Sequence, residues 1–282
     1  MALDSSGSMV VGGSFTIANL SGSPATNAAV NYNVVRLAKN AGTSMIDGVA
    51  DPSFTFLSQP LGPLNGQVRA VAIYPVGSGP NEKKILIGGD FTTVSYYNNN
   101  TNFAATNLLT TNFNRIVRLN SDGTLDPSWQ LTTGANASVR AITITPSGVA
   151  YVGGDFTSFG GPTTTVNANL VEITGDGDPS NVGFATGVGA GGTGGVGPGI
   201  YTLLYDSVNA QLYAGGAFTS FAGNNAFQQL VKLDAASGAP DATFNANLSG
   251  VPNSTVKALA SPQRPVWAGH RLAEQAGQHH RG

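Results

Sequence analysis

The stretch VGGDFTSFGG, residues 152–161, contains a five-residue core that occurs four times along the chain. The other copies of this motif are GGSFT (12–16), GGDFT (88–92) and GGAFT (215–219). Paired glycines permit the close approach of another backbone, or a bulge that redirects a strand. We expect the phenylalanine that follows to fill the space between neighbouring sheets. Four copies therefore indicate an architecture and not a single nucleotide site.

Three further kinds of segment accompany the motif in a fixed order. Strand-like runs precede three copies and recur after the last copy, as VRAVAIYP (68–75), VRAITITP (139–146), IYTLLYD (200–206) and VKALASP (256–262). A second run follows each copy, as VVRLAKNAG (34–42), IVRLNSDG (116–123), LVEITGDG (170–177) and LVKLDAASG (230–238). A short third element comes next, as DPSF (51–54), DPSW (126–129), DPSN (178–181) and DATF (241–244). Successive motif copies are 76, 65 and 62 residues apart, which indicates a repeat architecture.

Each unit is predicted to be β-structure. In VRAITITP, Ile142 and Ile144 would share one face of a strand, and turn sequences such as PSG (146–148) punctuate the runs. No segment shows the apolar stripe of an amphipathic helix. Three or four short strands in each unit fit the blade of a β-propeller, whereas a solenoid normally has a shorter repeat.

We therefore predict an all-β fold, a β-propeller of about four repeat blades within residues 1–262, either as an incomplete ring or as a fragment of a larger one. The blade cores are expected near residues 9–54, 68–129, 139–184 and 200–244, with an extra strand at 256–262. The chain starts inside a unit and ends on an extra first strand, so pairing of its two ends would close a four-blade ring. An open fragment would instead expose unpaired strand edges.

Residues 263–282 form an atypical tail that departs from the repeat. The tail carries all three histidines and three arginines of the chain, namely Arg264, His270, Arg271, His279, His280 and Arg281. We interpret this abrupt change of composition as a reading-frame error or a truncated gene. The nucleotide sequence would decide the question, because a shifted frame should encode a repeat-like peptide.

The composition excludes several classes of function. Only 10% of the 282 residues are charged, and the formal net charge is −2. Without clustered lysine and arginine, the chain lacks the means to neutralise nucleic-acid phosphates or to bind an anionic membrane surface. It has no cysteine, which rules out disulfides, thiolate catalysis and cysteine-ligated metals. No apolar run reaches the roughly 18 residues of a membrane helix, and no signal peptide is visible.

The combined pattern resembles a known repeat family. The segments VRAITITPSGVAYVGGDFTSFGG (139–161), NLVEI (169–173) and RLNSDGTLDPSW (118–129) are similar to the delta-60 repeat of bacterial β-propeller-like proteins. The similarity runs from about residue 2 to about residue 262. It implies a propeller within a large protein that is secreted or exposed at the cell surface. It implies no established reaction and supplies no catalytic residues.

The loop between each motif and the next strand is the candidate binding surface. These loops vary in length and should lie on one face of the ring, where variable loops on a rigid scaffold commonly carry binding. The longest includes VSYYNNNTNFAATNLLTTNFN (94–114), in which Tyr96, Tyr97, Asn98 and Phe103 combine aromatic faces with amide groups. These four residues are the predicted ligand site for a glycan or a protein. The alternative is a solvated insertion without a ligand.

Three other motifs have simpler explanations than a bound ligand. GVGAGGTGGVGPG (187–199) is too rich in glycine for a dinucleotide fingerprint and suits a flexible linker. Gly-Gly-Asp-Phe is similar to the diguanylate cyclase signature, but Phe91 and Phe156 stand where the next acid is required. The acidic turns NSDGTLD (120–126) and GDGDPSN (175–181) lack the full calcium-loop pattern and suit hairpins. We predict no cofactor and no metal.

No catalytic residue is predicted. A Ser-His-Asp set is excluded because no histidine precedes residue 270. Asp51, Asp90 and Asp155 leave open a carboxylate pair for glycoside hydrolysis. Their repeated positions favour a structural role, such as accepting hydrogen bonds from backbone N–H groups.

Three functions remain at this stage. The first is a non-catalytic module for recognition or adhesion at a bacterial surface, with Tyr96, Tyr97 and Phe103 as anchors. The second is a purely structural repeat segment of a larger secreted protein. The third is a carbohydrate-active enzyme.

Overall fold

The protein is almost entirely β-structure. The computed structural model describes residues 1–18, 30–39, 51, 53–54, 64–97, 108–129, 133–160, 168–173, 175, 190–191, 199–248, 252 and 254–261. In these residues the helical segments are the 3₁₀ turn η1 (Gly79–Asn81) and the short helix α1 (Ala242–Asn247). The all-β fold class predicted from the sequence is confirmed. None of the helices in these ranges has the length and apolar character needed to cross a bilayer.

Four three-stranded antiparallel sheets form the framework, and we number them in chain order as units 1 to 4. Unit 1 contains β1 (Ala2–Leu3), β2 (Met9–Ala18) and β3 (Val30–Leu37), and unit 2 contains β4 (Val68–Ile73), β5 (Ile85–Gly89) and β8 (Ile116–Leu119). Unit 3 contains β9 (Val139–Ile144), β10 (Ala150–Gly154) and β11 (Leu170–Ile173), and unit 4 contains β13 (Ile200–Asp206), β14 (Gln211–Gly216) and β16 (Leu230–Asp234). The strand that carries the two glycines is always the middle one. The repeated order of segments in the sequence is thus a repeated meander of three strands.

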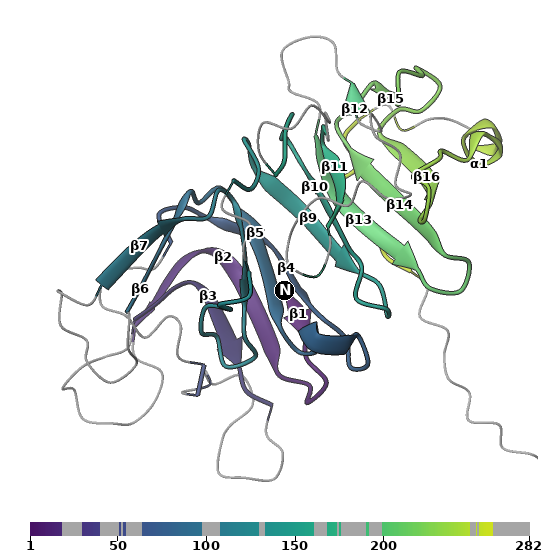
Figure 1. Ribbon diagram of the computed structural model, residues 1–282. Helices are drawn as coiled ribbons and strands as arrows, with labels where there is room; N and C mark the ends of the chain where they lie inside the picture. Colours follow the sequence, from purple (N-terminus) through teal and green to yellow (C-terminus); the bar gives the residue numbers. More distant parts are fainter. Residues whose placement is uncertain are drawn as a thin grey trace, which may run out of the picture.

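Two small sheets accompany this framework. The hairpin of β6 (Thr93–Tyr97) and β7 (Leu108–Asn112) is inserted between the middle and third strands of unit 2. The pair of β12 (Ala190–Gly191) and β15 (Ser220–Phe221) lies beside unit 4 (Figure 1).

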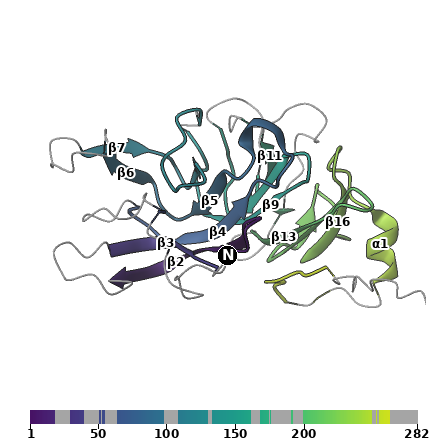
Figure 2. The same ribbon diagram turned by 90° about the horizontal axis from the view of Figure 1, so that it is seen from below.

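The four units stand side by side in chain order (Figure 1). Each first strand packs against the first strand of the next unit, so that β4 contacts β9 and β9 contacts β13. In unit 1 the middle strand β2 contacts β4. Seen from below, units 1 and 2 form neighbouring layers, and α1 packs on the outer strand of unit 4 (Figure 2). The row is therefore built from a repeated face-to-face contact.

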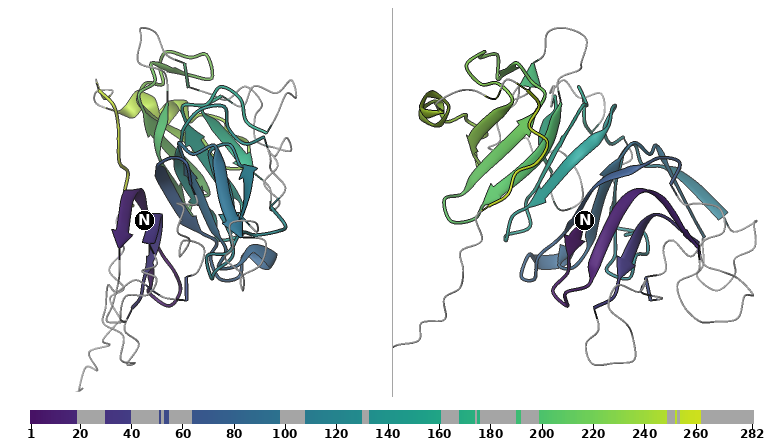
Figure 3. Two further views of the ribbon diagram at one scale, coloured as in Figure 1. Left: turned by 90° about the vertical axis from the view of Figure 1, so that its left-hand side faces the viewer. Right: turned by 180° about the vertical axis from the view of Figure 1, so that it is seen from behind.

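The row of units does not close into a ring in the described part of the chain. Units 1 and 4 are the first and last of an arc of units (Figures 2 and 3), and their strands remain in separate sheets. The closure of a four-blade ring, considered from the sequence, is not observed among these residues. The segment expected to supply the closing strand contacts unit 4, where the Val256 N–H donates to the Gly216 carbonyl at 3.1 Å.

The first glycine of each motif lets the next unit approach. A Cβ atom at Gly153 would lie 2.6 Å from Cγ2 of Ile200, and one at Gly215 would lie 2.6 Å from Cγ1 of Val256. The equivalent glycines of units 1 and 2 meet the same kind of side chain, as Gly12 against Val68 and Gly88 against Val139. Since real Cβ atoms do not come this close to a neighbour, any larger residue would push two units apart. The first glycine therefore admits a side chain of the next unit, and not the backbone that we expected there.

The second glycine has a different role within its own unit. At Gly154 an added Cβ would collide with the carbonyl of Ser138, which precedes the first strand. The same carbonyl accepts the N–H of Asp155 at 2.9 Å, and the strand register shifts between Gly153 and Gly154. The second glycine therefore shows both predicted features, the close approach of another backbone and a bulge.

The motif phenylalanine is fixed by a pair of reciprocal backbone bonds. In unit 2 the carbonyl of Phe91 accepts the N–H of Arg115 at 2.7 Å, and the carbonyl of Arg115 accepts the N–H of Gly89 at 3.0 Å. Arg115 adopts a positive φ of 69° to make this turn, as do the residues at the same position in the other units, Asn33, Asn169 and Gln229. Phe91, Phe156 and Phe218 are fully buried, whereas Phe15 of unit 1 is half-buried.

We predict that Gly153→Ala destabilises the protein by about 1–3 kcal/mol, because the new methyl group overpacks the contact with Ile200. The double variant Gly153→Ala/Ile200→Ala should lose less stability than the sum of its two single variants, since removing Cγ2 makes room for the methyl group. Urea unfolding of the four proteins measures this coupling. Strictly additive losses would show that the glycine is not needed for approach of the next unit.

Candidate functional site

The predicted loop site belongs to the inserted hairpin of unit 2. Tyr96 and Tyr97 end strand β6, where their backbones pair with Leu109 and Leu108 of β7. The side chains of these two tyrosines lie outside the described residues, as do Asn98 and Phe103 entirely. The four residues therefore stay a predicted ligand site, and what the structure describes is the base that carries them.

That base is well anchored. Val94 of β6 is fully buried in the main apolar cluster and forms an antiparallel bridge with Leu64. Further along the hairpin, the hydroxyls of Ser95 and Thr110 lie 2.9 Å apart across the two strands. The hairpin is thus attached rigidly at one end, and Leu109 and Thr110 on its second strand are exposed to solvent.

The motif aspartates of units 2 and 3 are engaged in ion pairs. Asp90 lies 2.6 Å from a guanidinium nitrogen of Arg69, and Asp155 lies 2.6 Å from one of Arg140. The arginine comes from the first strand of the same unit in both cases. The hydrogen bond from Arg69 lowers the pKa of Asp90 below its ordinary value. Both side chains therefore accept bonds mainly from arginine, and not from the backbone N–H groups that we expected.

These ion pairs are linked across units 2 and 3. The Ser138 hydroxyl, which precedes the first strand of unit 3, donates to the carboxylate of Asp90. The guanidinium of Arg140 then stacks 4.6 Å above the ring centroid of Tyr201 in unit 4. Asp90 and Asp155 thus belong to one polar ladder that runs along the first strands. Asp51 lies elsewhere, beside Arg36 and Ser53, so the three carboxylates do not form one site.

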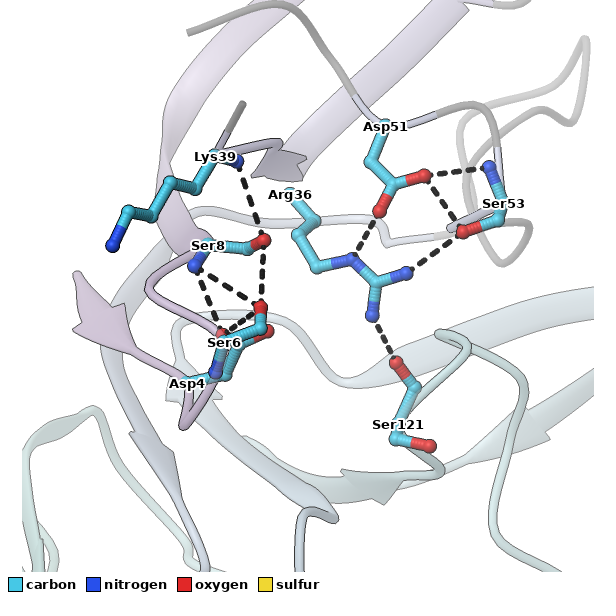
Figure 4. Close-up of polar contacts among 8 residues, drawn as sticks. All are labelled: Asp4, Ser6, Ser8, Arg36, Lys39, Asp51, Ser53 and Ser121. Atoms are coloured by element: carbon cyan, nitrogen blue, oxygen red, sulfur yellow. Dashed lines mark hydrogen bonds and ion pairs between the residues drawn. The ribbon is translucent and has the colours of Figure 1, made fainter. Parts of the chain in front are cut away.

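Asp51 belongs to a second repeated arrangement, which we call the basic anchor. In unit 1 the third-strand residue Arg36 donates to Asp51 at 2.8 Å and to Ser53 at 2.9 Å (Figure 4). Its guanidinium lies 5.2 Å from the ring centroid of Phe54. Asp51 also accepts the backbone N–H and hydroxyl of Ser53, as a structural carboxylate should. The DPSF element therefore encloses an arginine between a carboxylate and an aromatic ring.

The basic anchor recurs in units 2 and 4. Arg118 donates to Asp126 at 2.6 Å, and its guanidinium lies 5.1 Å from the ring centroid of Trp129. In unit 4 the equivalent contacts join Lys232 to Asp241 at 2.9 Å and to the ring of Phe244. In all three units the aspartate N–H also bonds to the carbonyl of the basic residue, which covers the outer edge of the third strand.

Burial and hydrogen bonding act in opposite directions on Asp126. Burial alone raises its pKa, but hydrogen bonds from Lys84, Ser128 and Arg118 together lower it to about 2. The side chains of Arg118 and Asp126 are both about 1% exposed. A buried pair that is completed by further hydrogen bonds holds its geometry, and loss of either partner would leave an uncompensated charge.

The basic anchors also join neighbouring units. Arg36 donates to the carbonyl of Ser121 in unit 2 (Figure 4), and Arg118 donates to the carbonyl of Gly175 in unit 3. Unit 3 has Glu172 at the basic position, and a carboxylate cannot donate. There the Tyr151 hydroxyl reaches the equivalent carbonyl, that of Ala235 in unit 4, at 2.7 Å. One carbonyl in each following unit is thus satisfied by the unit before it.

Sequence reasoning missed this anchor, although a signal was present. The aromatic residue of the third element accompanies a basic residue in the preceding strand in units 1, 2 and 4. Unit 3 departs at both positions together, with Glu172 and Asn181. When two positions change together in one unit, they are expected to contact each other. The fixed order of the segments does not by itself indicate such a contact.

A hollow of about 250 Å³ opens beside the first anchor, between units 1 and 2. Its lining residues are Asp4, Ser5, Ser6, Val10, Arg36, Ile73, Lys83, Ile85 and Ser121. The donors of Arg36 are already used by the protein, and Asp4 accepts the N–H groups of Ser6 and Ser8 in its own turn (Figure 4). No cluster of three potential metal-binding side chains occurs in the described ranges. The hollow is a junction between units with no aligned set of reactive groups.

Comparison with known families agrees with the propeller interpretation. Residues 83–128 match a family model described as a β-propeller domain of unknown function, DUF5122. The matched stretch covers the middle and third strands of unit 2, the inserted hairpin and most of the DPSW element. No curated protein matches the chain.

We predict that Asp126→Asn lowers the stability of the protein in a pH-dependent way. The pKa of Asp126 falls from an ordinary 3.8 to about 2 in the folded state, so its carboxylate contributes about 2 kcal/mol above pH 5. This contribution is lost as the pH falls through about 2. The difference in unfolding free energy between wild type and variant, measured in urea, should therefore narrow from pH 6 towards pH 2.

The matched control for this measurement is Asp122→Asn, which removes an exposed carboxylate from the neighbouring turn. We expect the control to change stability by less than about 0.5 kcal/mol. If Asp126→Asn lowered the unfolding free energy by the same amount at every pH, the ion-pair explanation would be contradicted.

We also predict that Tyr151→Phe costs about 1–2 kcal/mol, because it leaves the buried carbonyl of Ala235 without its donor. Tyr205→Phe is the control, since Tyr205 lies beside Tyr151 with ring centroids 6.4 Å apart. Guanidinium unfolding followed by fluorescence distinguishes the two variants. If Tyr151→Phe and Tyr205→Phe had the same unfolding free energy, the hydrogen bond between units 3 and 4 would contribute little to stability.

Proposed function

We propose that the protein is a non-catalytic β-propeller repeat module that displays loops for recognition or adhesion outside the cell, at a cell surface. The match of unit 2 to a β-propeller family supports the scaffold part of this proposal. The blade-like units would then form part of a ring whose loops share one face. The partner would be a glycan or a protein, bound through shape complementarity.

The observation that carries the proposal is the hairpin of unit 2. Strands β6 and β7 lengthen one loop of an otherwise regular repeat, and the buried Val94 fixes that loop to the core. A rigid base lowers the entropic cost of ordering the loop upon binding. Tyr96, Tyr97 and Phe103 would supply aromatic surface, and Asn98 would supply an amide for orientation.

The electrostatics of the scaffold support a non-catalytic role. A glycosidase needs one carboxyl group whose pKa is raised so that it stays protonated as a general acid. Asp51, Asp90 and Asp126 instead have lowered pKa values, and each is hydrogen-bonded to a basic side chain. Carboxylates of this kind stabilise a fold and are poor proton donors at neutral pH.

We predict that Tyr97→Ala abolishes binding on an array of bacterial and host glycans, or to surface proteins, while the unfolding free energy changes by less than about 1 kcal/mol. Tyr213→Ala, on the middle strand of unit 4, is the control for loss of a tyrosine away from the hairpin. A second variant replaces residues 95–110 with a short turn and keeps Val94. Binding unchanged in both hairpin variants would show that the hairpin is not the binding site, and no binding by the wild type would favour a purely structural segment of a larger secreted protein.

The carbohydrate-active alternative has its own test. Turnover of a polysaccharide that is lost in Asp155→Asn, with the fold intact by circular dichroism, would overturn the non-catalytic proposal. We expect no turnover in either protein, because Asp155 is paired with Arg140.

A further inference from the structure

The inserted hairpin of unit 2 has one strand edge that is open in the described part of the chain. Among the described strands, β7 pairs with β6 alone, and it lies at the margin of the molecule, away from units 3 and 4 (Figures 1 and 2). The other side of β6 is occupied near its start, where Val94 bridges to Leu64. The outer side of β7 is therefore the part of the hairpin that can take a further strand.

The hydrogen-bond pattern of the hairpin shows which backbone groups face this edge. The Phe113 N–H donates to the Thr92 carbonyl at 3.0 Å, and antiparallel residues alternate between hydrogen-bonded and non-hydrogen-bonded pairs. Thr111 and Leu109 therefore bond to β6. The alternate residues of β7, whose N–H and carbonyl groups point away from β6, are Leu108, Thr110 and Asn112.

This edge lacks the protection that the edge strands of units 2 to 4 have. Natural proteins discourage the pairing of an exposed edge with a charge, a proline or a bulge. The edge strands of units 2 to 4 each carry a charged residue, namely Arg69, Arg118, Arg140, Glu172, Asp206 and Lys232. Residues 91–114, in contrast, contain no charged residue, no proline and no glycine, and the register of β6 and β7 has no bulge. A regular and uncharged edge favours pairing with another strand.

The backbone of β7 is complementary to a second copy of itself. We consider two β7 strands that run antiparallel about a twofold axis at Thr110. Thr110 then forms a hydrogen-bonded pair with its own counterpart, and Leu108 pairs with Asn112 on both sides of the axis. Every outward N–H and carbonyl group of the strand thereby finds a partner.

The described side chains fit the same pairing. Leu109, which is 39% exposed, would lie opposite Thr111 and be partly covered by it. The Thr110 hydroxyl already lies 2.9 Å from the hydroxyl of Ser95, so the pairing would place four hydroxyls in one row across the sheet. Cross-strand hydroxyl pairs stabilise a sheet, and no like charges oppose each other here.

From this edge we propose that the protein forms a twofold-symmetric dimer in which β7 of one copy pairs antiparallel with β7 of a second copy. The two hairpins would form one four-stranded sheet in the order β6–β7–β7–β6. Because the contact is isologous, it closes with two copies and does not propagate. The contact has only the five residues of β7 on each side, so we expect a dissociation constant of about 10–100 µM. The proposal does not depend on what the loop between β6 and β7 binds.

The absence of cysteine from the sequence allows a direct test of the register. In a non-hydrogen-bonded pair the Cα atoms lie about 4.5 Å apart, which a disulfide can bridge, whereas diagonal neighbours lie about 7–8 Å apart. One full-length copy carries Leu109→Cys and the other carries Thr111→Cys. Under mild oxidation, the mixture should form a disulfide-linked heterodimer at least about 10-fold faster than either variant forms a homodimer. We expect no such acceleration when Ser207→Cys, in an exposed turn of unit 4, replaces Thr111→Cys.

Sedimentation of charge variants supplies the second measurement. Thr110→Lys places two ammonium groups beside the twofold axis, and Thr110→Glu places two carboxylates there, so each variant alone should be monomeric at about 200 µM, where the wild type forms dimers. A mixture of the two variants should recover the dimer, because lysine then faces glutamate. Ser207→Lys is the matched control, and it should associate as the wild type does.

Three outcomes would overturn the proposal. Wild-type protein that stays monomeric at about 200 µM would show that the edge does not take a second copy. Self-association that neither Thr110 variant weakens would place the contact elsewhere on the protein. Assemblies larger than dimers that both variants dissolve would show open-ended stacking of hairpins. None of these outcomes bears on glycan or protein binding by the loop, which Tyr97→Ala tests separately.

Discussion

The contact between a motif glycine and a β-branched side chain of the next unit sets the geometry of the whole molecule. Gly153 against Ile200 and Gly215 against Val256 bring two sheets closer than any larger residue would allow. The spacing of first strands, and with it the position of every anchor, follows from this approach. A protein built this way is stabilised mainly between nearest neighbours, as in other repeat architectures.

Two arginines of this sparsely charged chain lie at junctions between units. The anchors of Arg36 and Arg118 neutralise a carboxylate inside their own unit and also bond to a carbonyl of the next unit. Each anchor thereby covers the outer edge of its own third strand, and its arginine also binds the next unit. At the junction of units 3 and 4 this bond comes from Tyr151, and the apolar core also divides into two clusters there.

Much of the fold could be predicted because it depends on local sequence patterns. Alternation in VRAITITP and the turns after it predict the strands of unit 3. The paired glycines predict the bulge and the close approach of a backbone, and both occur at Gly154. For the candidate site, the sequence predicted the long loop that carries it. The structure shows that the β6–β7 hairpin forms the base of this loop. The ion pairs of Asp90 and Asp155 were not predicted, because pairing with Arg69 and Arg140 depends on strand register and not on spacing in the chain.

The sequence by itself determined the repeated β-unit, its strand order and the burial of Phe91, Phe156 and Phe218, because these follow from short-range periodicity and from residue size. The tertiary structure alone decided which residues meet across units. The bonds from Arg36 to Ser121 and from Tyr151 to Ala235 join positions more than 80 residues apart. Such contacts require the relative placement of two sheets, which is set by packing of whole faces and has no local signature in the chain.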